Sequence, residues 1–418
     1  MVQGVREGHS LSELIPRVAA NARAGTQALS FEVLRRLGGA TAVRGVLAHK
    51  APPPAVDALL VSAIALLWPP APGARAAYPD HTLVDQAVHA AHQRTPAAVG
   101  FINAVLRRFV REREALVTAA ERQPEGAFNH PQWWIERLRH DWPAHWQSLL
   151  REANRHPPMT LRINARRGDA AAYVQRLAAH GQAAHAAGSH TVILAEPCPV
   201  TQLPGFAEGE VSVQDAAAQR AAPLLLGEGL PPGARVLDAC AAPGGKTAHL
   251  LELAELDVLA LDSDPQRLTR VQDTLKRLHL AATLKAGDAR QPATWWDGRP
   301  FDAILLDAPC TASGIGRRHP DIRWLRRPSD IAALAQVQAQ MLDALWQLLA
   351  PGGRLLYATC SVFPAEGQAQ IDAFLQRQGP GAAQLDPASP GHLLPLPDNA
   401  QAGAVTADGF FYALIHQP

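Results

Sequence analysis

The stretch RVLDACAAPGGKT (residues 235–247) constrains the fold of this chain more than any other segment. A short apolar run ends in Asp238, and small residues, Pro243, two adjacent glycines and Lys246 lead into a helix-compatible segment. The pattern predicts a strand, a tight turn and a helix. In parallel α/β sheets, ligands bind at the carboxyl ends of strands, where small turn residues let the backbone approach closely. The stretch therefore predicts a ligand-binding edge of such a sheet.

Beyond Pro231 the chain alternates strictly between strand and helix patterns, which predicts a doubly wound sheet. The strand patterns are RVLDAC (235–240), DVLALDSD (257–264), ATLKAGD (282–288), FDAILLDAPC (301–310), GRLLYATCS (353–361) and GFFYALIHQ (409–417). The helix patterns are KTAHLLELAE (246–255), PQRLTRVQDTLKRL (265–278), SDIAALAQVQAQMLDALWQLL (329–349) and AEGQAQIDAFLQRQ (365–378). Ser329 or Asp330 is expected to cap the long helix. Residues 379–408, rich in Pro, Gly and Ala, are predicted to form an irregular loop.

The front of the chain, from about residue 11 to residue 121, is rich in alanine and reads as an all-α bundle. Apolar residues recur there at spacings of three and four, as in FINAVLRRFV, which begins at Phe101. The last helix of the bundle carries a cluster of four arginines, Arg107, Arg108, Arg111 and Arg113. This basic cluster can lie along a phosphate backbone, or it can be ordinary solvated charge on one helix face.

Charge is distributed unevenly along the chain. Residues 1–167 hold 21 Lys and Arg against 13 Asp and Glu, a balance of +8, while the remainder has a balance of −7, which together give the net +1. A basic front half indicates contact with a polyanion. A mildly basic helical domain with solvated faces accounts for the same numbers.

The middle of the chain, residues 123–226, changes composition. It concentrates Trp133, Trp134, Trp142 and Trp146, whose indoles can pack short helices together or stack on nucleobases. MTLRINARR (159–167) and HTVILAE (190–196) are strand patterns, AAAYVQRLAAHG (170–181) is a helix pattern, and VSVQDAAAQRAAPLLL (211–226) is a strand leading to a helix. These patterns predict a small α+β module.

Cysteine usage and hydropathy restrict the class of protein. The four cysteines, Cys198, Cys240, Cys310 and Cys360, are too few for a disulfide framework and lack the spacing of a zinc site. The sequence contains no signal-peptide pattern and no apolar run of membrane-spanning length. We therefore expect a cytoplasmic protein with reduced thiols, without a metal centre and without a membrane partner.

Acidic residues end three successive strand patterns. Asp262 ends the second, where an acid can accept from ribose hydroxyls, and Asp288 ends the third, where it can accept from an adenine amino group. Asp264 is the poorer candidate for the ribose. A nicotinamide cofactor would suit Asp262, but the first turn lacks the GxGxxG pattern, which favours an adenosyl ligand without phosphates. Each acid alone can instead be a helix N-cap.

Two further strand ends carry thiols, in DAPC (307–310) and ATCS (358–361). In a doubly wound sheet these strands are neighbours, so both thiols are expected at the ligand-binding edge. A single buried cysteine is usually inert packing, but two thiols there indicate covalent catalysis. Thiolate addition to carbon 6 of a pyrimidine makes carbon 5 nucleophilic, and Asp307 can serve as the acid near the ring N3. The spacing does not decide which cysteine attacks.

Residues 211–418 resemble the RNA cytosine-5 methyltransferases that use S-adenosylmethionine. The motifs VQDAAAQ, DACAAPGGKT, LDSD, AGDAR, DAPCTASGIGRRHPDIRWLR and YATCSV stand in that family's order and spacing. The whole chain resembles the family's bacterial ribosomal RNA branch, called the Sun or RsmB type. GFINAVLRRF is similar to the signature of the NusB antitermination-factor domain, and HPQWWIERLRHDWPAHW and HPPMTLRIN are similar to the branch's middle module.

The resemblance implies S-adenosylmethionine as the cofactor and a role for each motif residue. The family's nucleophile is the TCS cysteine, here Cys360, and its DAPC cysteine, here Cys310, assists release of the methylated product. Asp307 is implied near the target base and at the cofactor. The other implied cofactor residues are Cys240, Ala241, Ala242, Pro243, Gly244, Gly245, Lys246, Asp262 and Asp288. The implied RNA-facing residues are Arg317, Arg318 and His319, and the helical cluster adds Arg107 and Arg108.

The chain departs from the family pattern at three places. Thr311 replaces the usual serine and Gly316 takes an aliphatic position, and neither change touches the required thiols or acids. Met1 falls inside the first helix, which is usually longer in this family. We therefore expect a slightly truncated bundle or a misassigned start codon.

The combined expectation is an α/β fold. A doubly wound, Rossmann-like class I methyltransferase domain (218–418) would follow an all-α NusB-like RNA-binding domain (1–124) and a small α+β module (125–217). The expected reaction methylates carbon 5 of a cytidine in small-subunit (16S) ribosomal RNA, with the base turned out of its stack by a monomeric enzyme. The alternatives are methylation of transfer RNA, a non-catalytic adaptor of the antitermination type, and a small-molecule methyltransferase. The two thiols argue against a non-catalytic adaptor. A small-molecule substrate would leave the basic front half without a function.

Overall fold

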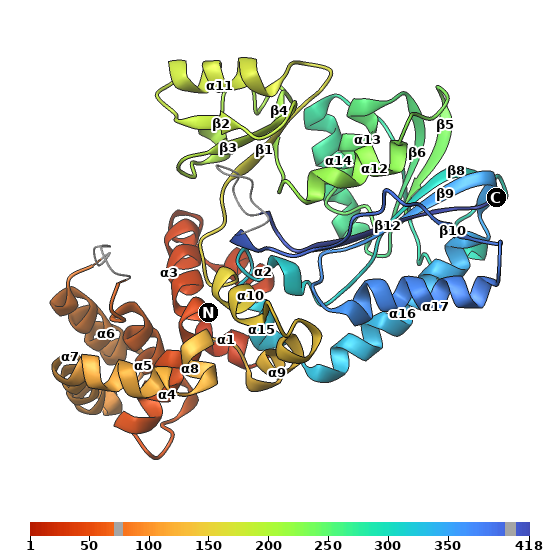
Figure 1. Cartoon of the computed structure of the whole chain (residues 1–418). Helices are drawn as coiled ribbons and strands as arrows, with labels where there is room; N and C mark the ends of the chain where they lie inside the picture. The colour runs from red at the N-terminus through yellow and green to blue at the C-terminus, as the bar shows by residue number, and fades with distance from the viewer. Residues whose placement is uncertain (71–77, 398–406) are drawn as a thin grey trace. The chain divides into compact units, whose positions relative to one another are not determined.

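The computed structural model describes residues 1–70, 78–397 and 407–418 (Figure 1). The described chain forms two compact units, Met1–Arg155 with Gly316–Pro328, and His156–Ile315 with Ser329–Pro418. Residues 125–155 therefore group with the front helices, and the small sheet groups with the large one. The three-part division at residues 124 and 217 stays a prediction.

The first unit is helical throughout its described residues. Its α-helices are α1 (Val2–Arg6), α2 (Leu11–Leu14), α3 (Arg23–Arg35), α4 (Leu37–Leu47), α5 (Pro54–Leu66), α6 (Asp80–Arg94), α7 (Val99–Glu121), α8 (Pro124–Phe128), α9 (Gln132–Asp141), α10 (Trp146–Glu152) and α15 (Ile322–Leu325). The apolar stripe predicted on α7 is buried at Val105, Leu106 and Phe109. Phe101, the first apolar residue of that pattern, is 42% exposed.

The tryptophans of α9 and α10 pack within this unit. Trp134 is 3% exposed, and its ring centroid lies 5.2 Å from that of Trp133. The ring of Trp146 lies 5.2 Å from that of Phe128. These contacts account for the indoles by packing, without a nucleobase.

The second unit contains a small antiparallel sheet in the strand order β2-β3-β1-β4. Its strands are β1 (Thr160–Ile163), β2 (Ala184–Ala186), β3 (Thr191–Leu194) and β4 (Val211–Val213), and α11 (Ala170–Ala179) packs on it. The α+β module predicted from the sequence is therefore present. β2 was missed because its residues read as part of a connection.

The large sheet of the second unit has the described strand order β10-β12-β9-β8-β5-β6-β7, and β11 pairs with β12. Its strands are β5 (Ala234–Asp238), β6 (Leu256–Asp262), β7 (Thr283–Ala286), β8 (Phe301–Asp307), β9 (Leu349–Thr359), β10 (Gln384–Leu385), β11 (Gly391–Leu393) and β12 (Phe410–His416). The strands from β9 to β7 are parallel, and β12 is antiparallel to β9. The order reverses between β5 and β8, which places a topological switch point there.

Helices cover both faces of the large sheet (Figure 1). One face carries α12 (Ala221–Leu226), α13 (Gly245–Leu253) and α14 (Pro265–Leu278), and the other carries α16 (Pro328–Trp346) and α17 (Gln368–Gln378). Central residues such as Leu305 and Leu356 are fully buried, as a two-sided parallel sheet requires. The expected doubly wound, Rossmann-like fold is confirmed.

Two details differ from the sequence-based expectation. The loop predicted over residues 379–408 contains β10 and β11, which extend the sheet edge along β12, while residues 398–406 lie outside the described chain. The helix α16 begins at Pro328, because proline suits the first turn of a helix, so neither Ser329 nor Asp330 precedes it as a cap. Among the described helices, none has the length and hydropathy to span a membrane.

Candidate active site

The carboxyl ends of β5, β6, β8 and β9 meet at one edge of the large sheet. Asp238, Asp262 and Asp307 are the last residues of β5, β6 and β8. Asp307 is paired in register with Ala358 of β9, two residues before Cys360. The motifs that the sequence analysis singled out are therefore brought together, as predicted from the alternation of strands and helices.

The turn between β5 and α13 is the predicted cofactor loop. Its residue Gly244 has φ +98°, and a Cβ there would lie 3.1 Å from the Cα of Val271. The backbone N–H of Ala241 donates to Leu261 O of β6 at 2.9 Å. Only glycine fits this conformation and this approach to α14, which explains the first glycine of the Gly-Gly pair.

Cys240 lies in this loop among carboxylates. Burial, and then the charges of Asp307, Asp238 and Asp262, raise the pKa of the Cys240 thiol far above its ordinary value. Its thiol therefore stays protonated at neutral pH. A thiol kept in this form is a poor nucleophile.

Asp238 is almost fully buried beneath the same loop, at 1% exposure. Burial raises its pKa to about 7, and the hydroxyl of Thr247 opposes the shift by donating to Oδ2 at 2.6 Å. The other oxygen, Oδ1, is buried and has no hydrogen-bond partner among the described residues. A buried acceptor without a donor is costly in a protein interior, so this oxygen marks a place where a ligand donor can bind.

The acids at the ends of β6 and β7 have backbone and arginine partners. Asp262 Oδ2 accepts from the N–H of Ala242 at 3.2 Å, which ties the cofactor loop to β6. Asp264 caps α14 by accepting from the N–H of Gln266, the role that the sequence left open for it. Asp288 forms an ion pair with Arg290 at 2.7 Å, and this arginine's hydrogen bond lowers its pKa.

Lys246 and Asp307 form the central ion pair of the edge. Lys246 Nζ lies 2.6 Å from Asp307 Oδ2 and 5.3 Å from the ring centroid of Phe410. Burial acts to lower the pKa of Lys246, but Asp307 raises it above its ordinary value, with help from the charge of Cys360. The ammonium group therefore stays charged beside both Asp307 and Cys360.

Cys310 and Cys360 touch each other. Their Sγ atoms are 3.5 Å apart, and Cys310 is 9% exposed. The hydrogen bond with Cys360, and then burial, raise the pKa of Cys310 well above its ordinary value. The two sulfurs share one hydrogen bond, in which either sulfur can be the donor.

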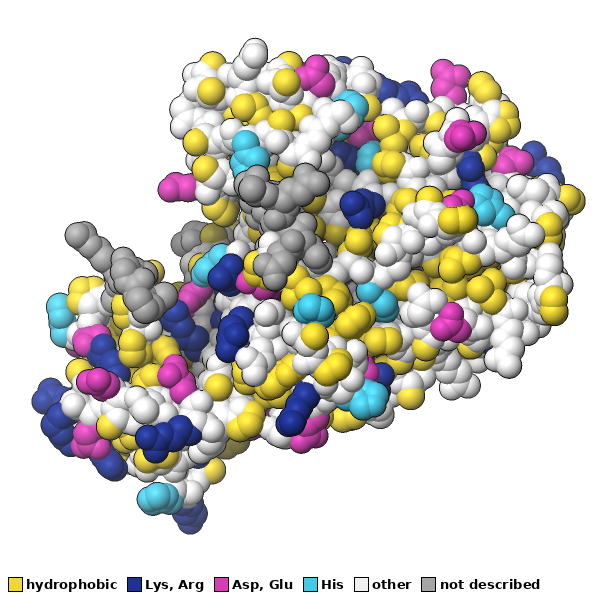
Figure 2. Space-filling model, viewed as in Figure 1, with side chains coloured by type: hydrophobic (Ala, Val, Ile, Leu, Met, Phe, Trp, Pro, Cys, Tyr) yellow, Lys and Arg dark blue, Asp and Glu magenta, His cyan; other side chains and the backbone are white. Residues whose placement is uncertain are grey.

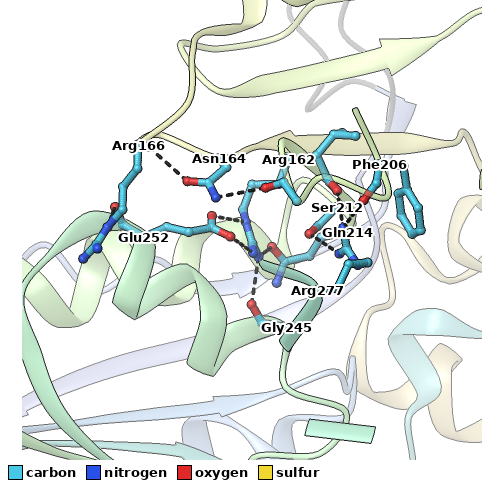
Figure 3. Close-up of polar contacts among 11 residues, drawn as sticks. Arg162, Asn164, Arg166, Phe206, Ser212, Gln214, Gly245, Glu252 and Arg277 are labelled. Atoms are coloured by element: carbon cyan, nitrogen blue, oxygen red, sulfur yellow. Dashed lines mark hydrogen bonds and ion pairs between the residues drawn. The ribbon is translucent and has the colours of Figure 1, made fainter. Parts of the chain in front are cut away.

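A buried arginine of the small sheet also contacts the cofactor loop (Figure 3). Arg162 of β1 donates from Nη1 to the carbonyl oxygen of Gly245 at 2.8 Å, and it binds both carboxylate oxygens of Glu252 at 2.8 and 2.9 Å. Arg277 of α14 donates to the carbonyl oxygens of Phe206 and Val211 at 2.7 and 3.0 Å. The small sheet is thereby fixed to α13 and α14 within the second unit.

Arg162 is a site residue that could not be recognised from the sequence. The only indication in the sequence was a single arginine inside the short strand TLRI. In the structure all four residues of this strand are buried. An arginine at such a position needs several acceptors, because burying its charge alone is costly. Such a requirement predicts a polar network, but not which groups form it.

The predicted RNA-facing residues of the first unit fall into two groups. His319 is exposed and Arg318 partly exposed, whereas Arg317 is only 3% exposed and so is poorly placed for direct RNA contact. On α7, Arg107 and Arg108 are exposed. Figure 2 shows basic side chains, with acidic ones between them, gathered where α6 and α7 lie.

The segment 316–328 is held by the helices of the first unit. Arg323 is fully buried and donates to the carbonyl oxygen of Ala153 at 2.6 Å and to the side chain of Asn154. Asp321 accepts from the N–H of Leu11 at 2.9 Å. Burial of Arg317 follows from this docking, which the basic composition of the segment did not suggest.

Strand order, switch point and acidic edge together define a Rossmann-like methyltransferase. Residues 230–416 match the family model described as 16S rRNA methyltransferase RsmB/F, and residues 130–201 match an RsmF/B-like, ferredoxin-like domain. A ribosomal RNA small subunit methyltransferase B from Vibrio cholerae is 43% identical, covering 99% of this chain and 95% of the relative. One from Pseudomonas putida is 49% identical over 81% of this chain and 78% of the relative.

The chain belongs to the family of ribosomal RNA small subunit methyltransferase B. Solved structures agree on the fold. The crystal structure of PH0851 covers 100% of this chain and 97% of its own with a TM-score of 0.78 at 24% identity. A methyltransferase homologue from Pyrococcus horikoshii covers 70% of this chain and 97% of its own with a TM-score of 0.59 at 25% identity. Within the described residues, no group of His, Cys, Asp and Glu side chains is arranged to hold a metal ion.

Proposed function

We propose that this RNA methyltransferase transfers a methyl group from S-adenosylmethionine to carbon 5 of a cytidine in small-subunit ribosomal RNA, through a covalent bond to Cys360. The observation that carries the proposal is the 3.5 Å contact between Cys310 and Cys360 beside the Lys246–Asp307 ion pair. A methyltransferase that acts on an exocyclic nitrogen or a ribose hydroxyl has no use for two thiols in contact.

The residues around the β5–α13 turn fit an adenosyl cofactor. The Gly244 turn lets a ligand approach the backbone, and Asp238 Oδ1 offers a buried acceptor. Asp262 is the last residue of β6 and Asp288 follows β7, and each carboxylate oxygen can accept a second hydrogen bond from a hydroxyl or amino group. The cofactor, when bound, supplies an electrophilic methyl group to the edge.

The two thiols divide the chemistry of the base between them. The Cys360 sulfur adds to carbon 6, so that the electron pair displaced from the ring makes carbon 5 nucleophilic. The Lys246–Asp307 pair would lie at the polar edge of the ring, with Asp307 near N3. After methylation, Cys310, which has released its own proton to solvent, accepts the proton of carbon 5 as a thiolate. The electron pair left on carbon 5 re-forms the ring double bond as the bond between carbon 6 and the Cys360 sulfur breaks.

Proton control follows from the contact between the sulfurs. The largest cause of the raised pKa of Cys310 is its hydrogen bond with Cys360. That bond is lost when the Cys360 sulfur is bonded to carbon 6. Cys310 therefore becomes a stronger acid, and its thiolate more accessible, at the step in which a proton must leave carbon 5.

The substrate assignment to small-subunit ribosomal RNA rests on family membership. The exposed α7 arginines would support RNA binding by the first unit, with Arg318 and His319 as further contacts. We expect the enzyme to act as a monomer in the cytoplasm. Transfer RNA is the alternative substrate of the same chemistry, and an adaptor role would leave the thiol pair unexplained.

The test is transfer of labelled methyl from S-adenosylmethionine to unmodified 16S ribosomal RNA, with transfer RNA in parallel. Nuclease digestion and mass spectrometry of the product should give 5-methylcytidine from the ribosomal RNA. Label in another nucleoside would refute the cytosine-5 assignment. Label in 5-methylcytidine of transfer RNA alone would refute the substrate assignment and leave the thiol chemistry intact.

A further inference from the structure

One buried carboxylate connects the segments that carry the two thiols. Glu366 lies in the short 3-10 turn Pro364–Glu366 between β9 and α17 and is fully buried. Its Oε1 accepts from the backbone N–H of Thr311 at 2.8 Å. Its Oε2 accepts from the hydroxyl of Thr311 at 2.5 Å and from that of Ser361 at 2.6 Å. Thr311 directly follows Cys310, and Ser361 directly follows Cys360.

Gln338 of α16 completes the connection. Its Nε2 donates to Glu366 Oε1 at 3.3 Å and to the carbonyl oxygen of Pro309 at 2.9 Å. Residues on both sides of Cys310 are thus held by one polar cluster. The N–H of Gly314 also donates to the carbonyl oxygen of Cys360 at 2.9 Å, which fixes the two segments to each other.

The loop after Cys310 needs such a restraint. Ala312 has φ +59°, a left-handed conformation that is unfavourable for a residue other than glycine. A buried carboxylate is likewise unfavourable unless donors surround it. Burial raises the pKa of Glu366, while the hydroxyls of Ser361 and Thr311 act to lower it. The donors around Glu366 make its burial tolerable, and the hydrogen bonds of Thr311 to Glu366 hold the loop that contains Ala312.

We propose that Glu366 is the positioning residue that holds Cys310 and Cys360 in sulfur contact, and so allows one thiol to attack and the other to accept the proton. The inference rests on the proposed thiol chemistry for its catalytic consequence. Its geometric content does not depend on that chemistry, because the distance between two thiols can be probed without RNA or cofactor.

The geometric test uses phenylarsine oxide, which reacts with two neighbouring thiols, forms two As–S bonds and releases water. In the full-length protein, mass spectrometry should find one arsenical bridging Cys310 and Cys360. The variant Glu366→Gln keeps the size of the side chain but replaces one of its two acceptor oxygens with an NH₂ group, which then faces two of the four donors. Its capture of the arsenical should be slower by about tenfold, because the thiols lose their preorganised separation. Cys198→Ala is the control and should capture at the wild-type rate.

The catalytic test compares kcat and KM in methyl transfer. We expect Glu366→Gln to lower kcat by about 100-fold, since a misplacement of the order of 1 Å costs this much. The KM for S-adenosylmethionine should change less than about twofold, because this interaction is not made to the cofactor. A purely structural loss of folded protein would lower the active fraction and leave the kcat of the remainder unchanged.

Two further variants keep the test decisive if Glu366→Gln does not fold. Thr311→Val removes one donor to Oε2, whereas Thr311→Ser keeps it and should restore the wild-type rates of both capture and methylation. Wild-type arsenical capture by folded Glu366→Gln or by Thr311→Val would overturn the inference. Altered capture together with unaltered methylation would leave the geometry in place and refute the proposed use of the thiols.

Discussion

Cys240 and the Cys310–Cys360 pair lie at the same edge of the same sheet, yet their surroundings differ. Cys240 sits among three carboxylates, which together with burial raise its pKa far above the ordinary value. Cys310 and Cys360 share a hydrogen bond, with the Lys246 ammonium beside Cys360. The comparison teaches that a cysteine at a strand end is not by itself a nucleophile. Its nearest charges and its sulfur partner decide the role.

The largest effect should separate the two kinds of cysteine directly. Cys360→Ala should lower methyl transfer by at least about 1,000-fold, because it removes the sulfur that we propose bonds to carbon 6. Cys240→Ala should keep activity within about threefold, since its protonated thiol only fills space in the loop. Steady-state rates with labelled cofactor measure both. Equal losses of methyl-transfer activity in Cys360→Ala and Cys240→Ala would contradict the different roles assigned to these two cysteines.

A second prediction concerns how the Cys240 loop is held in shape. Arg162→Met leaves Glu252 buried without its partner, which should lower the free energy of unfolding by roughly 3–5 kcal/mol. The double variant Arg162→Met, Glu252→Leu removes both charges and should regain most of this stability. Because the contact to Gly245 O stays lost, the double variant should still bind S-adenosylmethionine about tenfold more weakly.

Thermal unfolding and isothermal titration of cofactor binding separate these two contributions. The matched control is Arg166→Met, because Arg166 contacts the carbonyl oxygens of Glu252 and Ala254 but not the cofactor loop. If the double variant recovered both stability and cofactor affinity, Arg162 would contribute only to the stability of the fold and not to cofactor binding.

A third prediction uses the raised pKa of Asp238. With a folded-state pKa of about 7, Asp238 keeps a proton that the unfolded chain releases near pH 4. Its contribution to stability is therefore complete below pH 4 and is lost as the pH rises to 7. Asp238→Asn cannot ionise. Its free energy of unfolding should therefore rise relative to that of the wild type by about 3 kcal/mol between these pH values.

Urea unfolding at several pH values measures this difference. A constant difference between Asp238→Asn and the wild type from pH 4 to pH 7 would contradict the assignment of a protonated Asp238 beside Cys240.

The sequence predicted the convergence of the thiols more reliably than it predicted what supports them. Alternating strands and helices require β8 and β9 to be neighbours, so Cys310 and Cys360 could be placed together from their positions alone. Glu366 could not be found in this way. Its contacts with Thr311 and Ser361 form only when the loops fold, and the sequence does not show them.

Basic segments were the least predictable part of the site. Arg108 on α7 and Arg323 in the segment 316–328 look equivalent as sequence, but Arg108 is 47% exposed on its side chain and Arg323 is fully buried. Carbonyl acceptors supplied by Ala153 and Gly316 make burial of Arg323 possible. Such acceptors belong to the backbone and leave no trace in composition.

The smallest predicted effect concerns the exposed α7 cluster. Replacing Arg107, Arg108 and Arg111 by Gln should weaken binding of ribosomal RNA by about threefold and flatten its salt dependence. The effect is small because Arg108 and Arg111 already pair with Glu112 at 2.9 and 2.8 Å. Cofactor affinity should not change. Filter binding at several salt concentrations checks this, and unchanged RNA affinity would remove α7 from the proposed RNA surface.

The most direct test of the central claim is trapping of the covalent bond between Cys360 and RNA. In Cys310→Ala the methylated base cannot lose its carbon 5 proton to a thiolate, so a protein–RNA adduct should accumulate with unmodified 16S ribosomal RNA and S-adenosylmethionine. The account predicts a shifted band on a denaturing gel for Cys310→Ala, and none for the double variant Cys310→Ala, Cys360→Ala. A shifted band that persists without Cys360 would contradict the assignment of Cys360 as the nucleophile.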